Sequence, residues 1–322
     1  MELVAPAGTL AALRDAIDAG ADTVYLGFRD ETNARNFPGL NFSRSDLAAG
    51  VAYAHTRGRK VYVAVNTFPQ AGNTAPWQRA IASAAELGAD AVILADIGLL
   101  DLAAARFPGL RLHLSVQAAA AEAVAIGFYH RAFGVRRVVL PRVLTLPEVA
   151  ELTAAVAPVE TEVFAFGGMC PMAEGRCSLS SYVTGQSPNR NGVCSPASHV
   201  RYEDRGGELV SRLGEFTVNR FGSEEAAGYP TLCKGRFSIP GRIGYLFEEP
   251  SSLDVVAVLG KLKAAGVAAL KIEGRQRGRA YVSAAVAAWR GLLDGKLDPA
   301  VALSGLSEGG KTTEGALKRS WR

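Results

Sequence analysis

The amino-acid sequence predicts an α/β fold of the TIM-type (β/α)8 barrel class, with a cysteine-bearing insertion between the seventh and eighth strands. Short apolar runs alternate with amphipathic helical stretches, roughly every 25–30 residues. The alternation yields eight strands, which is the number that closes such a barrel. All four cysteines fall in the one long break in the pattern. An open doubly wound sheet is the alternative, but no Gly-x-Gly-x-x-Gly follows the first strand.

The first two units show the signals on which the predicted elements rest. Residues 2–5 form a short apolar run that predicts a strand. Residues 9–19 repeat apolar side chains at helical spacing, and Gly20 is the expected end of that helix. In the second unit, Ser45 is the expected N-cap of a helix that ends before Gly58.

The same signals recur along the chain. The predicted strands are residues 2–5, 23–26, 60–65, 91–94, 110–114, 137–140, 162–166 and 267–272. The predicted helices are residues 9–19, 45–57, 76–87, 97–106, 118–129, 146–156, 251–265 and 278–293. Short strands that alternate with helices favour a parallel sheet with crossover helices.

The break in the alternation divides the chain into segments. They are residues 1–166 with the first seven β/α units, residues 167–250 as an iron–sulfur-binding insertion, residues 251–302 as the last unit closing the barrel, and residues 303–322 as a flexible tail. The insertion is too long to be a simple loop. It contains a predicted β-hairpin, with strands at 199–202 and 208–212.

Composition and charge are typical of a soluble globular protein. Of 322 residues, 48% are hydrophobic and 20% charged. The net charge of +4 comes without a long Lys/Arg run, so no nucleic-acid partner is expected. No charge-free apolar stretch is long enough to span a membrane, and residues 1–8 lack the pattern of a signal peptide. The expected location is the cytoplasm, where clustered cysteines bind metal or react more often than they form disulfides.

Cys170, Cys177, Cys194 and Cys233 are the only cysteines. Their spacing lacks the C-x2-C knuckles of zinc ribbons and differs from the spacings of ferredoxins. Cys170 follows the seventh predicted strand, and active sites of barrels lie at the carboxyl ends of the strands. This position favours a working iron–sulfur site with all four cysteines as ligands. A zinc site, and unligated or disulfide-bonded cysteines, stay open as alternatives.

Polar residues at the predicted strand ends should point into one pocket. Guanidinium groups suit carboxylates, and Asn or Gln amides can hold a ring oxygen. The catalytic candidates are Tyr25, Arg35, Asn66, Gln117, Glu273 and Arg275. Asn36, Asp96, Ser115 and Arg142 are further candidates of the same kind. Helix capping or mutual pairing is the alternative role for several of them.

Several stretches resemble a known family. Residues 162–170 (Glu-Val-Phe-Ala-Phe-Gly-Gly-Met-Cys) and 175–180 (Gly-Arg-Cys-Ser-Leu-Ser) are similar to the signature of the collagenase-like family of unassigned peptidases. That family normally has Ser or Ala in place of Gly168. The Gly168 departure resembles the UbiU branch of the family. Other stretches similar to that branch are residues 1–8, 33–37, 174–182, 191–196 and 271–275.

The resemblance implies a β/α barrel that binds a 4Fe–4S cluster through four cysteines matching these positions. It also implies a heterodimer with a related cluster-bearing partner, UbiV, and an associated sterol-carrier-like lipid-binding protein, UbiT. The implied reaction is oxygen-independent hydroxylation of the aromatic ring of ubiquinone precursors. Four cysteine ligands leave no open iron site, which favours electron transfer over direct substrate ligation.

Three other functions stay open as alternatives, one of which is a non-enzymatic cluster-binding assembly or sensor subunit that needs a partner to act. Related members hydroxylate RNA bases, with prephenate implicated as the oxygen source, so RNA hydroxylation is the second candidate. Peptidase chemistry is less favoured, because the sequence has no Gly-x-Ser-x-Gly and no His-Glu-x-x-His. A cysteine protease would need a free thiolate beside a histidine, whereas these cysteines come as a set of four.

Overall fold

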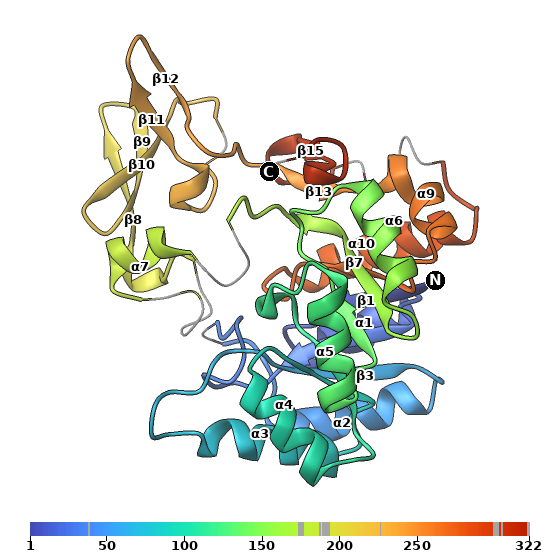
Figure 1. Cartoon of the computed structure of the whole chain (residues 1–322). Coiled ribbons are helices and arrows are strands. Elements are labelled where there is room, and N and C mark those ends of the chain that lie inside the picture. The colour runs from blue at the N-terminus through green and yellow to red at the C-terminus, as the bar shows by residue number, and fades with distance from the viewer. Residues whose placement is uncertain are drawn as a thin grey trace.

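Eight parallel strands close into a barrel, which confirms the predicted fold class (Figure 1). The computed structural model describes residues 1–37, 39–172, 177–186, 188, 194–225, 227–298, 303 and 305–320. The barrel strands are β1 (Glu2–Pro6), β2 (Thr23–Gly27), β3 (Lys60–Val65), β4 (Ala91–Leu94), β5 (Arg111–Leu114), β6 (Arg137–Val139), β7 (Glu160–Gly168) and β14 (Ala269–Ile272). Each pairs with its neighbour in this order, and β14 closes the ring by pairing with both β7 and β1.

Helices surround the barrel and cover its apolar strands. They are α1 (Leu10–Asp18), α2 (Arg44–His55), α3 (Ala75–Glu86), α4 (Ile97–Arg106), α5 (Ala123–Phe133), α6 (Leu146–Ala155), α9 (Leu259–Ala264) and α10 (Arg279–Leu293). Side-chain capping fixes where several begin; the α6 capping box, for example, pairs Thr145 with Glu148. No helix in the described part of the chain is long and apolar enough to cross a membrane.

Buried charges fill the barrel interior toward the amino ends of the strands. Arg137 Nη2 lies 2.6 Å from Glu2 Oε2, and Arg137 Nε donates to Glu160 Oε2 at 2.7 Å. Its Nη1 donates to Glu162 Oε2 at 3.2 Å, and Lys271 Nζ donates to Glu162 Oε1 at 2.7 Å. Every one of these charges has an opposite partner, which offsets the cost of removing it from water.

The segment between β7 and β14 forms separate small sheets. Strands β8 (Val200–Arg205), β9 (Glu208–Leu213) and β10 (Phe216–Phe221) make an antiparallel sheet, and β11 (Arg236–Ile239) pairs with β12 (Arg242–Tyr245). The β8–β9 pair confirms the predicted hairpin. Figure 1 shows these strands and α7 (Ser178–Thr184) gathered beside the barrel. Their own apolar core is small and centres on Leu213, Val218 and Leu232.

The structure corrects three predicted elements. The helix expected at 251–265 begins with a strand instead, β13 (Ser252–Asp254), which pairs antiparallel with β7. The N-cap of α2 is Ser43, whose hydroxyl accepts from Asp46 N, rather than Ser45. Helix α5 begins later than expected, because a 3-10 turn at Val116–Ala118 precedes it.

The end of the chain packs against this added edge of the sheet. Thr312–Thr313 (β15) pairs with β13, and Ala316 is fully buried. Residues 252–254 and 312–313 therefore extend the barrel sheet by two short strands next to β7, the strand from which the cysteine segment departs.

Candidate functional site

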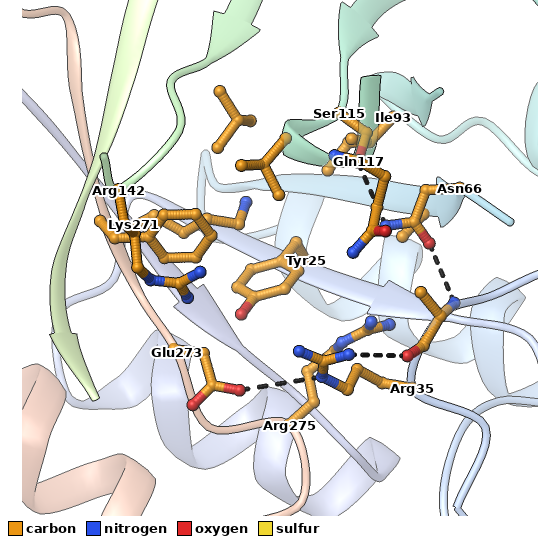
Figure 2. A pocket seen from close by; sticks show the side chains of 15 residues that line it. Tyr25, Arg35, Asn66, Ile93, Ser115, Gln117, Arg142, Lys271, Glu273 and Arg275 are labelled. Carbon is orange, nitrogen blue, oxygen red and sulfur yellow. Dashed lines mark hydrogen bonds and ion pairs between the residues drawn. The ribbon is translucent and has the colours of Figure 1, made fainter. Parts of the chain in front are cut away.

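A cavity opens at the carboxyl ends of the barrel strands, where the sequence predicts the site (Figure 2). All six catalytic candidates line it: Tyr25, Arg35, Asn66, Gln117, Glu273 and Arg275. They come from strands or loops that are distant in sequence and meet only because the barrel closes. Ser115 and Arg142 line it as well, whereas Asn36 and Asp96 lie outside this lining.

Tyr25 stands in the middle of the cavity lining (Figure 2). Its hydroxyl donates to the Ile272 carbonyl at 3.0 Å, which links β2 to β14. Lys271 Nζ lies 3.8 Å from the centre of the Tyr25 ring, within the range of a cation–π contact. Burial raises the pKa of Tyr25. The side chain is therefore a neutral aromatic surface with a fixed orientation.

The amide groups of Asn66 and Gln117 and the hydroxyl of Ser115 line another side of the cavity. Asn66 Oδ1 accepts from Ala34 N at 3.0 Å, and its Nδ2 donates to Ser115 Oγ at 3.2 Å. Ser115 Oγ in turn accepts from Gln117 N at 3.2 Å. These bonds hold the Asn66 amide in one orientation, so part of its role is structural. Figure 2 shows the Gln117 side chain reaching into the cavity beside it.

The cavity lining is rich in positive charge. It carries the cations Arg35, Arg142, Lys271 and Arg275 and the carboxylate of Glu273. Arg275 Nη1 donates to the neutral Asn33 side chain at 2.8 Å. Burial lowers the pKa of Arg275 to about 10, so its guanidinium remains cationic at neutral pH. An anionic group of a ligand would find favourable charge here.

Glu273 connects the cavity with the start of the cysteine segment. Its Oε2 accepts from Gly168 N at 3.2 Å, and its Oε1 lies 3.9 Å from Arg35 Nε. The neighbouring Gly167 has φ +122°, and a Cβ there would stand 2.6 Å from the Glu273 carbonyl oxygen. Only glycine fits this close approach of β7 to the end of β14. Cys170 follows Gly168 by two residues.

The four cysteines are half-buried, and no disulfide joins them, although all four belong to the described residues. Burial raises the pKa of the Cys194 thiol. Burial, together with the charges of the other three thiols, raises the pKa of the Cys233 thiol to about 12. The charges of Cys170, Cys177 and Cys194 thus all act on the Cys233 thiol. Bringing them together as thiolates requires a compensating positive charge such as a metal.

The donor set fits an iron–sulfur cluster by its chemistry. The positive charges of Arg35 and Lys234 favour the thiolate form of Cys194. Positive charge of this kind suits an anionic cluster held by thiolates. Within the described residues, no three His, Cys, Asp or Glu side chains lie together in a geometry that could hold a metal ion. Residues 173–176 and 189–193, which flank Cys177 and Cys194, are outside the described part. Coordination by the four cysteines therefore stays a prediction.

Among the cavity residues that the sequence analysis did not name, Lys271 and Phe164 carry a charge and an aromatic ring, and both lie within strands rather than after them. Lys271 is the third residue of β14, and Phe164 lies in the middle of β7 with Arg142 stacked 3.6 Å from its ring centre. The signal for Lys271 was a lone charge inside an apolar run. Asp96 instead has the alternative role, because its Oδ1 accepts from Leu99 N and caps α4.

Comparison with known proteins places the chain in a family. Residues 8–308 match the model of peptidase family U32. The tRNA hydroxylation protein P of Escherichia coli K12 is 34% identical over 343 aligned residues, covering 99% of this chain and 74% of that protein. Its Haemophilus influenzae namesake is 31% identical, covering 91% of this chain and 67% of that protein.

A third relative is the 23S rRNA 5-hydroxycytidine C2501 synthase of E. coli K12. It is 32% identical over 96% of this chain, which spans 42% of that longer protein. The chain belongs to peptidase family U32.

Proposed function

We propose that this chain is the iron–sulfur subunit of an oxygen-independent hydroxylase that acts on the aromatic ring of ubiquinone precursors. The observation that carries the proposal is the position of the cysteine segment. Four half-buried cysteines begin two residues after Gly168, whose amide is bound by a carboxylate of the cationic cavity. The names of the relatives, which are RNA hydroxylation proteins, support hydroxylation as the type of reaction.

Each part of the site has a role in this proposal. Cys170, Cys177, Cys194 and Cys233 would hold a 4Fe–4S cluster, which supplies one-electron transfer when bound. Four cysteine ligands would leave no open iron site, so the substrate would bind in the cavity and not on iron. Figure 2 shows how the lining could orient it. Arg35 and Arg275 attract an anionic group, Tyr25 and Phe164 pack against an aromatic ring, and Gln117 offers an amide to a ring oxygen.

The choice of ubiquinone precursors rests on the sequence resemblance to the UbiU branch. The glycine pair before Cys170 and the stretches at residues 1–8, 33–37 and 271–275 carry it. Two of these stretches contain Arg35 and Arg275, which lie in the cavity. The same resemblance supports a heterodimer with a UbiV-like protein, with UbiT as a possible third component. Tagged protein should retain the UbiV-like chain through anaerobic purification; a stable monomer that never does so contradicts the heterodimer.

Deletion of the gene followed by quinone analysis of anaerobic cultures tests the function. The deletion should abolish anaerobic ubiquinone while aerobic ubiquinone remains, and the wild-type gene should restore it. Arg275→Gln should fail to restore it, because the cavity loses a buried cation. Arg279→Gln is the matched control, because that arginine is exposed and pairs with Asp15 on the surface. Unchanged anaerobic ubiquinone in the deletion strain refutes the proposal.

RNA base hydroxylation is the second candidate, because the three relatives carry that function in their names. The same deletion strain distinguishes the two. Loss of a hydroxylated nucleoside from its tRNA or rRNA, with ubiquinone intact, would favour RNA as the substrate. Peptidase activity is least favoured, because the sequence has no Gly-x-Ser-x-Gly and no His-Glu-x-x-His, and its cysteines come as a set of four.

A further inference from the structure

We infer that the Arg35–Glu273 pair couples the occupancy of the cavity to the reduction potential of the cluster bound by the four cysteines. The inference rests on the proposed cluster, and it adds a positioning and regulatory role for two residues of this chain. In this role an anion that binds in the cavity lowers the reduction potential. The chain would then become a stronger electron donor only when its cavity is filled.

The first step of the argument is the placement of Glu273. One of its oxygens accepts from Gly168 N at 3.2 Å, and the other lies 3.9 Å from Arg35 Nε, on the side of the cavity. The carboxylate thus contacts both the backbone that leads to Cys170 and a cation that lines the cavity. Both side chains are largely shielded from solvent, with exposed fractions of 28% for Arg35 and 16% for Glu273. Their charges are screened less than those of surface groups.

The second step is that the same two charges act on a cysteine. The Cys194 thiol experiences the positive charge of Arg35 and the negative charge of Glu273. A guanidinium near a cluster stabilises the reduced, more negative state and raises the potential, and a carboxylate lowers it. Net charge near the cluster is one of the factors that set such potentials.

The third step is that a ligand can disturb this pair. At 3.9 Å, Arg35 Nε and the Glu273 oxygen lie beyond hydrogen-bonding distance, whereas Arg35 Nη1 donates to the Ala34 carbonyl at 2.9 Å. An incoming carboxylate can take a share of the Arg35 guanidinium and add a negative charge beside the cysteine segment. The reduction potential should then fall. By thermodynamic linkage, the same anion should bind the oxidised protein more tightly than the reduced protein.

A redox titration followed by electron paramagnetic resonance tests the coupling. Anaerobically purified protein is titrated with and without saturating 4-hydroxybenzoate, a phenolic carboxylate, whose affinity is measured separately by calorimetry. We expect the potential to fall when the probe is bound. A tenfold preference of the probe for the oxidised protein corresponds to a shift of about 59 mV for a one-electron couple.

Two variants of the pair and one control separate the coupling from general effects. At a probe concentration that calorimetry shows to fill its cavity, Arg35→Gln should leave the potential insensitive to the probe. Glu273→Gln should raise the potential of the empty protein. Glu308→Gln is the control, because Glu308 pairs with Lys234 at 2.8 Å, next to Cys233, but does not line the cavity. This control can shift the resting potential, but the shift caused by the probe should persist.

The outcomes distinguish the inference from the proposed function. A potential that stays the same when the probe is bound, or a cavity that does not bind the probe, overturns the coupling while leaving the cluster intact. A response to the probe that survives in Arg35→Gln also overturns it. A wild-type protein with no cluster signal at all overturns the proposed function and the coupling together.

Discussion

Gly167 and Gly168 show how single residues hold the cysteine segment at the cavity. A Cβ on Gly167 would stand 2.6 Å from the Glu273 carbonyl oxygen, and its φ of +122° is one that other residues rarely adopt. A Cβ on Gly168 would stand 3.2 Å from the end of the Glu273 side chain, which can move. The two adjacent glycines are therefore expected to tolerate an added side chain to different degrees.

This difference predicts unequal effects of the same substitution. Gly167→Ala should destabilise the protein by about 2 kcal/mol, through backbone strain and the close approach to β14. Gly168→Ala should cost well under about 1 kcal/mol and serves as the matched control. Chemical denaturation of both variants measures the difference. Equal losses of stability would contradict the assigned contact of Gly167.

The strand-end rule located eight cavity residues from sequence because it depends only on where each strand stops. Tyr25, Asn66 and Arg275 come from three different units, yet the barrel brings them together. The rule could not show which strand residues face inward, so Lys271 and Phe164 were missed. The rule also could not show that Asp96 caps a helix instead of lining the cavity.

At the scale of the elements, the barrel depends on the charges inside it. Burial alone would raise the pKa of Glu2, but the hydrogen bond and charge of Arg137 bring the pKa of Glu2 down to about 2. The unfolded chain has the ordinary value of 4.5. A carboxyl pKa that is lower in the folded state stabilises the fold above pH 4.5, and this contribution is lost as the pH falls toward 2.

Glu2→Gln should therefore lower the free energy of unfolding by about 3 kcal/mol at pH 7, and by clearly less at pH 3. Glu86→Gln is the control, because Glu86 forms an exposed pair with Arg44. It should change stability by no more than about 0.5 kcal/mol. Urea denaturation at both pH values provides the measurement. A Glu2→Gln effect that does not depend on pH would contradict the assigned ion pair.

Most elements follow from local sequence signals, and the exceptions have long-range causes. The pattern of Leu253, Val255 and Val258 is compatible with a helix, but Ser252–Asp254 pairs with β7 across a long stretch of chain. Only the tertiary fold brings Ser252–Asp254 beside β7. The late start of α5 depends on the turn at Val116–Ala118, where Ala119 takes a left-handed conformation with φ +52°.

At the scale of the whole molecule, the chain contains a barrel with a large apolar core and a cysteine-bearing part with a small one. The barrel has a large apolar core and a second, smaller cluster around Tyr25 and Tyr62, whereas the core of the strands beside it centres on Leu213, Val218 and Leu232. The four cysteines clustered in sequence predict that a metal site stabilises this second part. Its small sheets could not be derived from strand periodicity alone beyond the β8–β9 hairpin, because they are short and separated by irregular turns.

Iron and acid-labile sulfide analysis of anaerobically purified protein tests the central claim most directly. The wild-type chain should be brown and contain about four iron and four sulfide per molecule, as expected of a 4Fe–4S cluster. Cys194→Ala should lose this content, while the barrel keeps its far-ultraviolet circular dichroism. A colourless, zinc-loaded wild-type protein, or a Cys194→Ala variant with its iron intact, would contradict a cluster held by these four cysteines.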